Sequence, residues 1–318
     1  MSSIPPQLIS TGNFQLPQSQ GEAKVIVATS AVKALHPSLS EAERHQVLDT
    51  MYRNVTYLDA FGTGNLIVHP VTGILMFRTK RSEQAWKGFV FEAALARWCR
   101  EQPEKIGKQA FGWCTGRNPN QISDAFYQKF TVFVRGDKSL LDKRETAILY
   151  NTGCPFDVQF YSINPQHELP EIATVKDTKI EAGIQVKAIT CNEMAQIIQP
   201  ILNGEYTHVL TLLNHPSGQH SYSVCQTILS NLLGSGKITL EEYAYVSQRI
   251  TYPGRLGIDQ QMIEEYSAYL SGCYHAGAAW TADVYDALSM EVVKDVYMSQ
   301  GGVLIPKALP IQIPGQGV

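Results

Sequence analysis

The segment Gly183-Ile184-Gln185-Val186-Lys187-Ala188-Ile189 decides the predicted fold. Apolar and polar side chains alternate along it, which is typical of a β-strand with one buried face. Pro155-Phe156-Asp157-Val158-Gln159-Phe160 shows the same alternation about 28 positions earlier. A Gln-x-Lys pair on one strand beside an Asp on its neighbour suits metal-assisted phosphodiester hydrolysis. Carboxylate and amide oxygens bind hard cations, and an ammonium group stabilises phosphate charge or the attacking water.

Length and charge agree with a globular protein. The 318 residues can bury a sizeable core, and the hydrophobic fraction of 44% is near the globular average. These values predict a soluble protein of one large or two modest domains. The net charge of −3 provides no overall basic field. A local basic groove is sufficient for nucleic acid, so DNA remains a possible partner.

Cysteine usage and hydropathy predict a cytoplasmic protein. The six cysteines include no C-x-x-C pair, which favours reduced thiols over a disulfide framework or a zinc site. The first residues contain neither a basic start nor an apolar export segment, and no run approaches the ~18 apolar residues of a membrane span.

The two ends of the chain differ in composition from the rest. Residues 1–21 carry no charge, and residues 301–318 carry only Lys307. Such segments cannot build a core alone. We expect an extended N-terminal arm over 1–24, an α/β core with an N-terminal elaboration over 25–215, a helical region over 216–300 and a C-terminal arm over 301–318. The arms are expected to contact copies of the chain, as in a homo-oligomer, or partner proteins.

Hydrophobic periodicity predicts the order of the elements. Helices are expected over 40–53, 83–101, 192–202 and 281–300, and strands over 65–69, 73–79, 130–134, 156–163, 183–190 and 207–213. Thr239 and Glu242 have the spacing of a capping box, which predicts a helix beginning there. A change to helical character after Gly234 places a domain boundary near 215–236.

The order helix, three strands, helix, strand resembles the PD-(D/E)xK nuclease superfamily, also called restriction-endonuclease-like. The resemblance covers about residues 83–215. Its signature corresponds to Glu92 in Gly88-Phe-Val-Phe-Glu92, to Asp157 and to Gln185-Val-Lys187. Gln in place of the acidic residue resembles the Gln-x-Lys variant of Mrr-like restriction enzymes. The resemblance implies an α/β fold, a mixed sheet flanked by helices, followed by the helical C-terminal region.

The same resemblance implies a metal-dependent DNA endonuclease. Glu92, Asp157, Gln185 and Lys187 would be catalytic, and Mg²⁺ or Mn²⁺ would be held by Asp157, Gln185, the Val186 carbonyl and Glu92. Lys187 would neutralise charge developing on the phosphate or orient the attacking water. Gln159, two residues after Asp157, is a possible supporting partner on the same side of the strand.

Ordinary structural roles are open for every one of these residues. Glu92 can be an exposed helix residue, Asp157 can cap a turn, and Gln185 with Lys187 can form the solvated face of an edge strand. The alternative function is a catalytically inactive nuclease-fold assembly protein of a phage particle or mobile element, which would be virion-associated.

Two rival motifs are weaker. Asp177-Thr-Lys179 is a literal D-x-K, but it lacks apolar flanks on the strand period and predicts a polar turn. His215 and His220 are separated by Pro and Gly, which predicts a loop rather than a zinc site.

Overall fold

The structure is a computed structural model that describes residues 82–278, apart from 165 and 167, together with positions 56, 59, 60, 66–68, 75–77, 297–300 and 303–306. The chain divides into two compact units. One comprises Met1–Glu83 with Glu265–Val318, and the other is Gln84–Glu264. The predicted helix over 40–53 and the arm over 1–24 lie outside the described residues.

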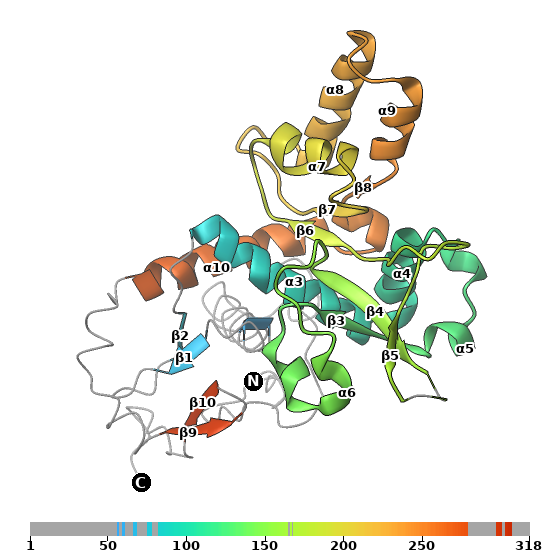
Figure 1. The fold of residues 1–318 in the computed structure, drawn as a ribbon. Coiled ribbons are helices and arrows are strands. Elements are labelled where there is room, and N and C mark those ends of the chain that lie inside the picture. Colours follow the sequence, from blue (N-terminus) through green and yellow to red (C-terminus); the bar gives the residue numbers. More distant parts are fainter. Residues whose placement is uncertain are drawn as a thin grey trace, which may run out of the picture. The chain divides into compact units, whose positions relative to one another are not determined.

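Two three-stranded sheets form the framework of the unit Gln84–Glu264 (Figure 1). The strands β3 (Phe130–Val134), β4 (Val158–Ile163) and β5 (Pro170–Ile172) are antiparallel, with β4 in the middle. The strands β6 (Gln185–Lys187), β7 (Val209–Thr211) and β8 (Ile250–Thr251) are parallel. An antiparallel bridge between Val158 and Ile184 connects the two sets. The predicted α/β class is therefore confirmed.

Helices and helical turns complete this unit. Its α-helices are α3 (Glu83–Glu101), α4 (Lys108–Thr115), α5 (Asp124–Tyr127), α6 (Arg144–Ala147), α7 (Gln199–Leu202), α8 (Ser221–Gly234) and α9 (Leu240–Ser247). The helix α10 (Gln260–Ala278) begins in this unit, and its residues from Glu265 onward belong to the other unit. π-Helical turns at Pro103–Gly107 and Met194–Ile198 lead into α4 and α7. The capping box predicted at Thr239 is present, with the Glu242 side chain accepting from the Thr239 N–H at 2.7 Å. Two orphan donors at the start of α9 are thereby satisfied.

Aromatic rings join α4 to the antiparallel strands. Phe111 of α4 meets Phe160 of β4 edge-on, with ring centroids 5.2 Å apart, and it meets Tyr127 of α5 at 5.7 Å. All three side chains are buried. Edge-to-face pairs of this kind stabilise beyond the area they bury, so they fix α4 and α5 against β4.

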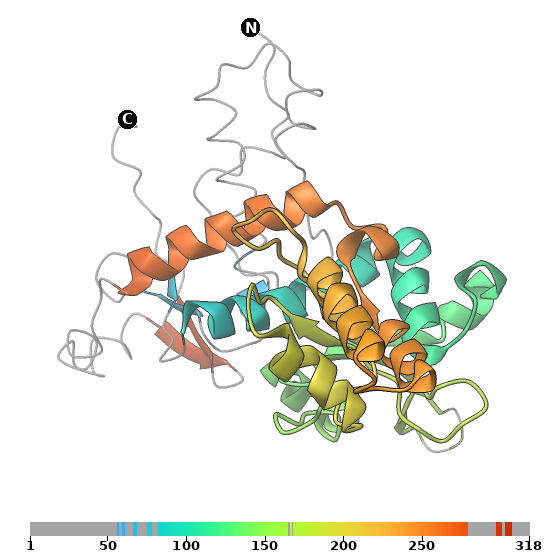
Figure 2. The same ribbon diagram turned by 90° about the horizontal axis from the view of Figure 1, so that it is seen from above.

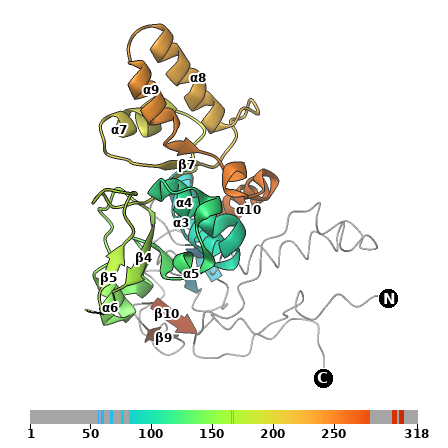
Figure 3. The ribbon, with the colours of Figure 1, turned by 90° about the vertical axis from the view of Figure 1, so that its right-hand side faces the viewer.

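A second core joins α7, α8 and α9 to the parallel strands. Figures 2 and 3 show α8 and α9 side by side. The buried residues of this core are Ile189, Ile197, Ile198, Ile201, Val209, Cys225, Leu229, Ile238, Val246 and Ile250. Since these residues come from both sides of position 215, the unit runs without a break through the boundary predicted near 215–236.

Several predicted elements have the bounds that the sequence indicated. α3 has the same bounds as the helix predicted over 83–101, and β3 has the same bounds as the strand predicted over 130–134. β1 (Leu66–Val68) and β2 (Leu75–Phe77) lie within the strands predicted over 65–69 and 73–79, and they pair antiparallel. β4, β6 and β7 are shorter than predicted.

One helical prediction is wrong at its end. The periodicity over 281–300 predicted helix, but β9 (Tyr297–Gln300) is a strand that pairs antiparallel with β10 (Val303–Pro306). The two glycines at 301 and 302 separate these strands, and a two-residue Gly-Gly loop is a strong hairpin signal. The paired strands therefore contain four residues of the region predicted as helical and four residues of the predicted C-terminal arm.

Two further findings concern the thiols and the helices. The cysteines at 99, 114, 154, 191 and 225 are free. Within the described part of the chain, no helix combines the length and apolar character needed to cross a membrane.

Candidate active site

Asp157 lies directly before β4; its backbone bonds to the residue before β6, and its side chain bonds to β6 itself. Its backbone N–H donates to the Ile184 carbonyl at 3.1 Å. Its carboxylate oxygen Oδ2 accepts the backbone N–H of Val186 at 2.7 Å. The structure therefore brings Asp157 and the Gln185-Val186-Lys187 segment together on neighbouring strands.

The hydrogen bonds of β6 determine which way its peptide groups face. Gln185 donates its N–H to the His208 carbonyl at 2.8 Å, and the Lys187 carbonyl accepts from Leu212 at 3.1 Å, so both residues face β7. In a parallel ladder only alternate residues bond to a given neighbour. The N–H and C=O of Val186 are consequently directed towards the β4 edge, where Asp157 lies.

A glycine permits the close approach of these two segments. A Cβ atom added to Gly183 would lie 2.5 Å from Cγ of Phe156 and 2.8 Å from Cγ of Gln159. Both distances are far below ordinary carbon contacts. Gly183 thus allows the start of β6 to pack closely against the residues that flank Asp157.

The electrostatic environment of Asp157 is unusual for a carboxyl group. Burial raises its pKa to about 6, although the Val186 N–H, the charge of Lys187 and a hydrogen bond from the Gln185 side chain act in the opposite direction. A half-buried carboxylate with a displaced pKa beside a specific cation is typical of functional sites.

Lys187 has a partner that sequence reasoning missed. Its ammonium nitrogen lies 3.3 Å from the Tyr206 hydroxyl oxygen and 4.8 Å from the centroid of the Tyr206 ring. Tyr206 lies between α7 and β7, and both side chains are half-buried. No pattern around Tyr206 distinguishes it from other tyrosines, so only the folded chain reveals this contact.

Glu92 is buried in the middle of α3, with 9% of its surface exposed. It is therefore not the exposed helix residue of the ordinary interpretation. The groups that shift the pKa of Asp157 all lie on β6, so the participation of Glu92 in the site stays a prediction.

The oxygen atoms around Asp157 are of the chemical types that bind hard cations. The candidate ligands are the Asp157 carboxylate, the Gln185 amide and the Val186 carbonyl on the same strand edge. A half-turn of the Gln185 amide exchanges its nitrogen for its oxygen, which makes the same side chain a ligand. Within the described residues, no group of three or more His, Cys, Asp or Glu side chains could hold a metal. A cation held by so few protein ligands would keep several waters and would bind together with a substrate phosphate, which is the usual behaviour of Mg²⁺.

Gln159 has a different role from the predicted one. Its amide nitrogen donates to the Ala182 carbonyl at 2.8 Å, and its amide oxygen accepts from Nε of Arg135. Arg135 also donates to the Leu149 carbonyl at 3.0 Å and to Glu181 at 3.0 Å. Because both Gln159 and Arg135 are buried, this network stabilises the sheet.

The rival motifs behave as the sequence indicated. Asp177 and Lys179 lie exposed in a turn, where Asp177 has a φ of 60°. Nε2 of His215 forms a hydrogen bond with the buried Glu193 carboxyl group, while Nδ1 of His220 accepts the backbone N–H of Tyr222 at 3.0 Å. The two histidines therefore stabilise their own loop and the start of α8.

Comparison of the chain with protein-family models, with curated proteins and with solved structures finds no match in any of the three.

Proposed function

We propose that this chain is a metal-dependent DNA endonuclease of the restriction-endonuclease-like class. The observation that carries the proposal is the local cluster at the start of β4 and along β6. There, Asp157 accepts the Val186 N–H, and Gln185 and Lys187 both act on the same carboxyl group. Strands that only pack a core rarely place a carboxylate, an amide and an ammonium group together.

The order and directions of the elements support this class. When β5 and the helices α4, α5 and α6 are left out, the order α3, β3, β4, β6, α7, β7 is helix, three strands, helix, strand. The strands β3 and β4 are antiparallel, a single antiparallel bridge joins Val158 of β4 to Ile184 directly before β6, and β6 and β7 are parallel. In the αβββαβ order of the family, Asp157 and Gln185-Val186-Lys187 would belong to the second and third strands.

Each residue has a definite chemical role in the proposed reaction. A divalent cation would supply Lewis-acid polarisation of the phosphoryl group. Asp157, Gln185 and the Val186 carbonyl would hold it, and Asp157 would be ionised when it does so. Lys187 would neutralise the charge that develops on the phosphate oxygens. Glu92 would add a second carboxylate.

The rival D-x-K motif supplies matched controls for the test. Lys187→Ala is compared with Lys179→Ala, in which an exposed lysine is removed from the nearby turn. The assay is cleavage of labelled single-stranded, duplex and branched DNA in Mg²⁺ or Mn²⁺. We expect Lys187→Ala to lose about 10²–10³ in rate, as for other groups that stabilise transition-state charge, while Lys179→Ala cleaves like the wild type. Equal rates for the two variants would contradict the role of Lys187.

A further inference from the structure

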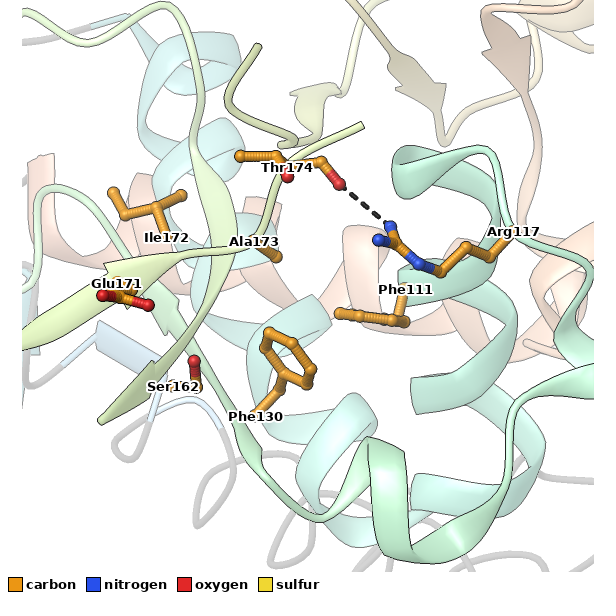
Figure 4. A pocket seen from close by; sticks show the side chains of 8 residues that line it. All are labelled: Phe111, Arg117, Phe130, Ser162, Glu171, Ile172, Ala173 and Thr174. Carbon is orange, nitrogen blue, oxygen red and sulfur yellow. Dashed lines mark hydrogen bonds between the residues drawn. The ribbon is translucent and has the colours of Figure 1, made fainter. Parts of the chain in front are cut away.

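Two adjoining hollows lie where α4 and α5 meet the antiparallel strands, and they share Arg117. The first has a volume of about 180 Å³ and is lined by Phe111, Arg117, Phe130, Ser162, Glu171, Ile172, Ala173 and Thr174 (Figure 4). The second has a volume of about 380 Å³, and its lining includes Arg117, Phe126 and Lys176. The first is below the roughly 300–1,000 Å³ of a complete small-molecule site, so it suits a single planar ring.

Arg117 is held at the junction of the hollows by its backbone contacts. It follows Gly116, whose φ of 68° ends α4, and its Nη1 donates to the Thr174 carbonyl at 2.9 Å. Its guanidinium carbon lies 6.0 Å from the Phe111 ring centroid and 5.9 Å from that of Phe126. A guanidinium has five N–H donors, so its position between the hollows leaves donors for an anion.

Aromatic side chains line both hollows. Phe130 borders the first and Phe126 the second, with ring centroids 5.4 Å apart. Both residues are partly exposed. Accessible aromatic rings are the surfaces on which unpaired bases stack, and each stacked base contributes about 1–3 kcal/mol in proteins that bind single strands.

The far wall of the first hollow carries hydrogen-bond acceptors. Figure 4 shows Ser162 and Glu171 on the side opposite Arg117. Glu171 already accepts from the Asn164 amide at 2.5 Å, but a carboxylate has about four lone-pair sites. It can therefore also accept from the amino group of a base.

The second hollow carries donors. Lys176 is exposed, and its backbone N–H is fixed to the Thr115 carbonyl at 2.8 Å. Asn118, Gln121 and Ser123 also line this hollow. The ammonium group, guanidinium and amides that line this hollow are donors suited to the oxygens of a phosphodiester.

We propose that the two hollows bind an unpaired nucleotide segment. A base would occupy the first hollow, and its phosphate would lie between Arg117 and Lys176. A base inside a duplex cannot enter such a hollow unless it leaves the stack. Since it rests on the proposed function, this inference defines the substrate class as DNA with single-stranded or extruded nucleotides.

Binding is measured in EDTA, where cleavage cannot interfere, by fluorescence anisotropy of a labelled dodecamer of deoxycytidine. Lys176→Glu is compared with Lys179→Glu, an exposed lysine of the same turn outside the lining. We expect weaker binding only for Lys176→Glu. Its slope of log affinity against log salt should fall by about 0.7, as for one lost phosphate contact on a single strand.

The aromatic wall is tested by a second pair of variants. Phe126→Leu keeps an apolar side chain but loses the ring, and it should bind roughly 5- to 150-fold more weakly. Phe126→Tyr keeps the ring and should bind like the wild type. Equal affinities for Lys176→Glu and Lys179→Glu, or for Phe126→Leu and Phe126→Tyr, would overturn the proposal. So would duplex binding as tight as single-strand binding.

The two proposals fail separately. If the wild type cleaves DNA but the pocket variants bind normally, the nucleotide site is wrong and the nuclease proposal stands. If the binding pattern holds but no DNA is cleaved, the nuclease proposal is wrong and the nucleotide site stands.

Discussion

Replacing Asp157 with Asn should stabilise the protein at pH 8. Burial raises the pKa of this carboxyl group from 3.8 to about 6, so the folded state disfavours the ionised form. Between pH 3.8 and 6 the unfolded chain loses a proton that the folded chain keeps, and stability falls as pH rises. At 1.36 kcal/mol per pKa unit, the full cost above pH 6 is about 3 kcal/mol. We expect Asp157→Asn to recover about 1–3 kcal/mol at pH 8, because the residue is partly exposed and the amide keeps an acceptor for the Val186 N–H.

The free energy of unfolding is measured by urea denaturation, with tryptophan fluorescence as the signal. Trp86, Trp98 and Trp113 report on the unit Gln84–Glu264. The difference in free energy of unfolding between Asp157→Asn and the wild type should shrink to near zero at pH 4. Asp177→Asn is the control, since Asp177 is exposed and Asn tolerates its positive φ. If Asp157→Asn instead lowers the free energy of unfolding at pH 8 by more than about 1 kcal/mol, Asp157 is a structural ion-pair partner of Lys187. That result would refute the claim that the ionised Asp157 destabilises the folded state.

Three further predictions concern the surroundings of the site. Gly183→Ala should lower the free energy of unfolding by about 1–3 kcal/mol through overpacking, whereas Gly136→Ala, where an added Cβ meets nothing within 4 Å, should not. Burial lowers the pKa of His208 to about 3, so stability is lost as pH falls below 6.5. His208→Gln removes this effect. Below pH 6.5 its free energy of unfolding should therefore fall less steeply than that of the wild type, by about 1.4 kcal/mol per pH unit. Arg135→Met should lower the free energy of unfolding, measured by urea denaturation, by about 3–5 kcal/mol, because its buried hydrogen-bond partners are left unpaired. An unchanged urea midpoint would show that Arg135 does not stabilise the fold.

Local patterns were sufficient to predict much of the framework. The bounds of α3 and β3 follow from periodicity alone. The alternation around Asp157 and Gln185 correctly predicted neighbouring strands, because a buried face fixes the register of a strand. The strand β9 was missed because its apolar residues also fit a helical period, and the pairing with β10 decided between the two.

Contacts between distant residues were out of reach. Tyr206 meets Lys187 through a side-chain contact across 19 positions, with no local signal. Gln159 was expected beside Asp157 because the strand period is two, yet its amide bonds to Arg135. A buried guanidinium requires acceptors, and only the folded chain shows that Gln159 supplies one.

The most direct test of the proposed function is cleavage of supercoiled plasmid by the purified full-length chain in Mg²⁺ or Mn²⁺, with EDTA and Asp157→Asn as controls. We expect the wild type to nick or linearise the plasmid only when metal is present, and Asp157→Asn to leave it supercoiled even though the variant is folded. A wild-type protein that leaves plasmid, single-stranded and branched DNA intact in both metals would contradict the account. The chain would then be better described as an assembly protein.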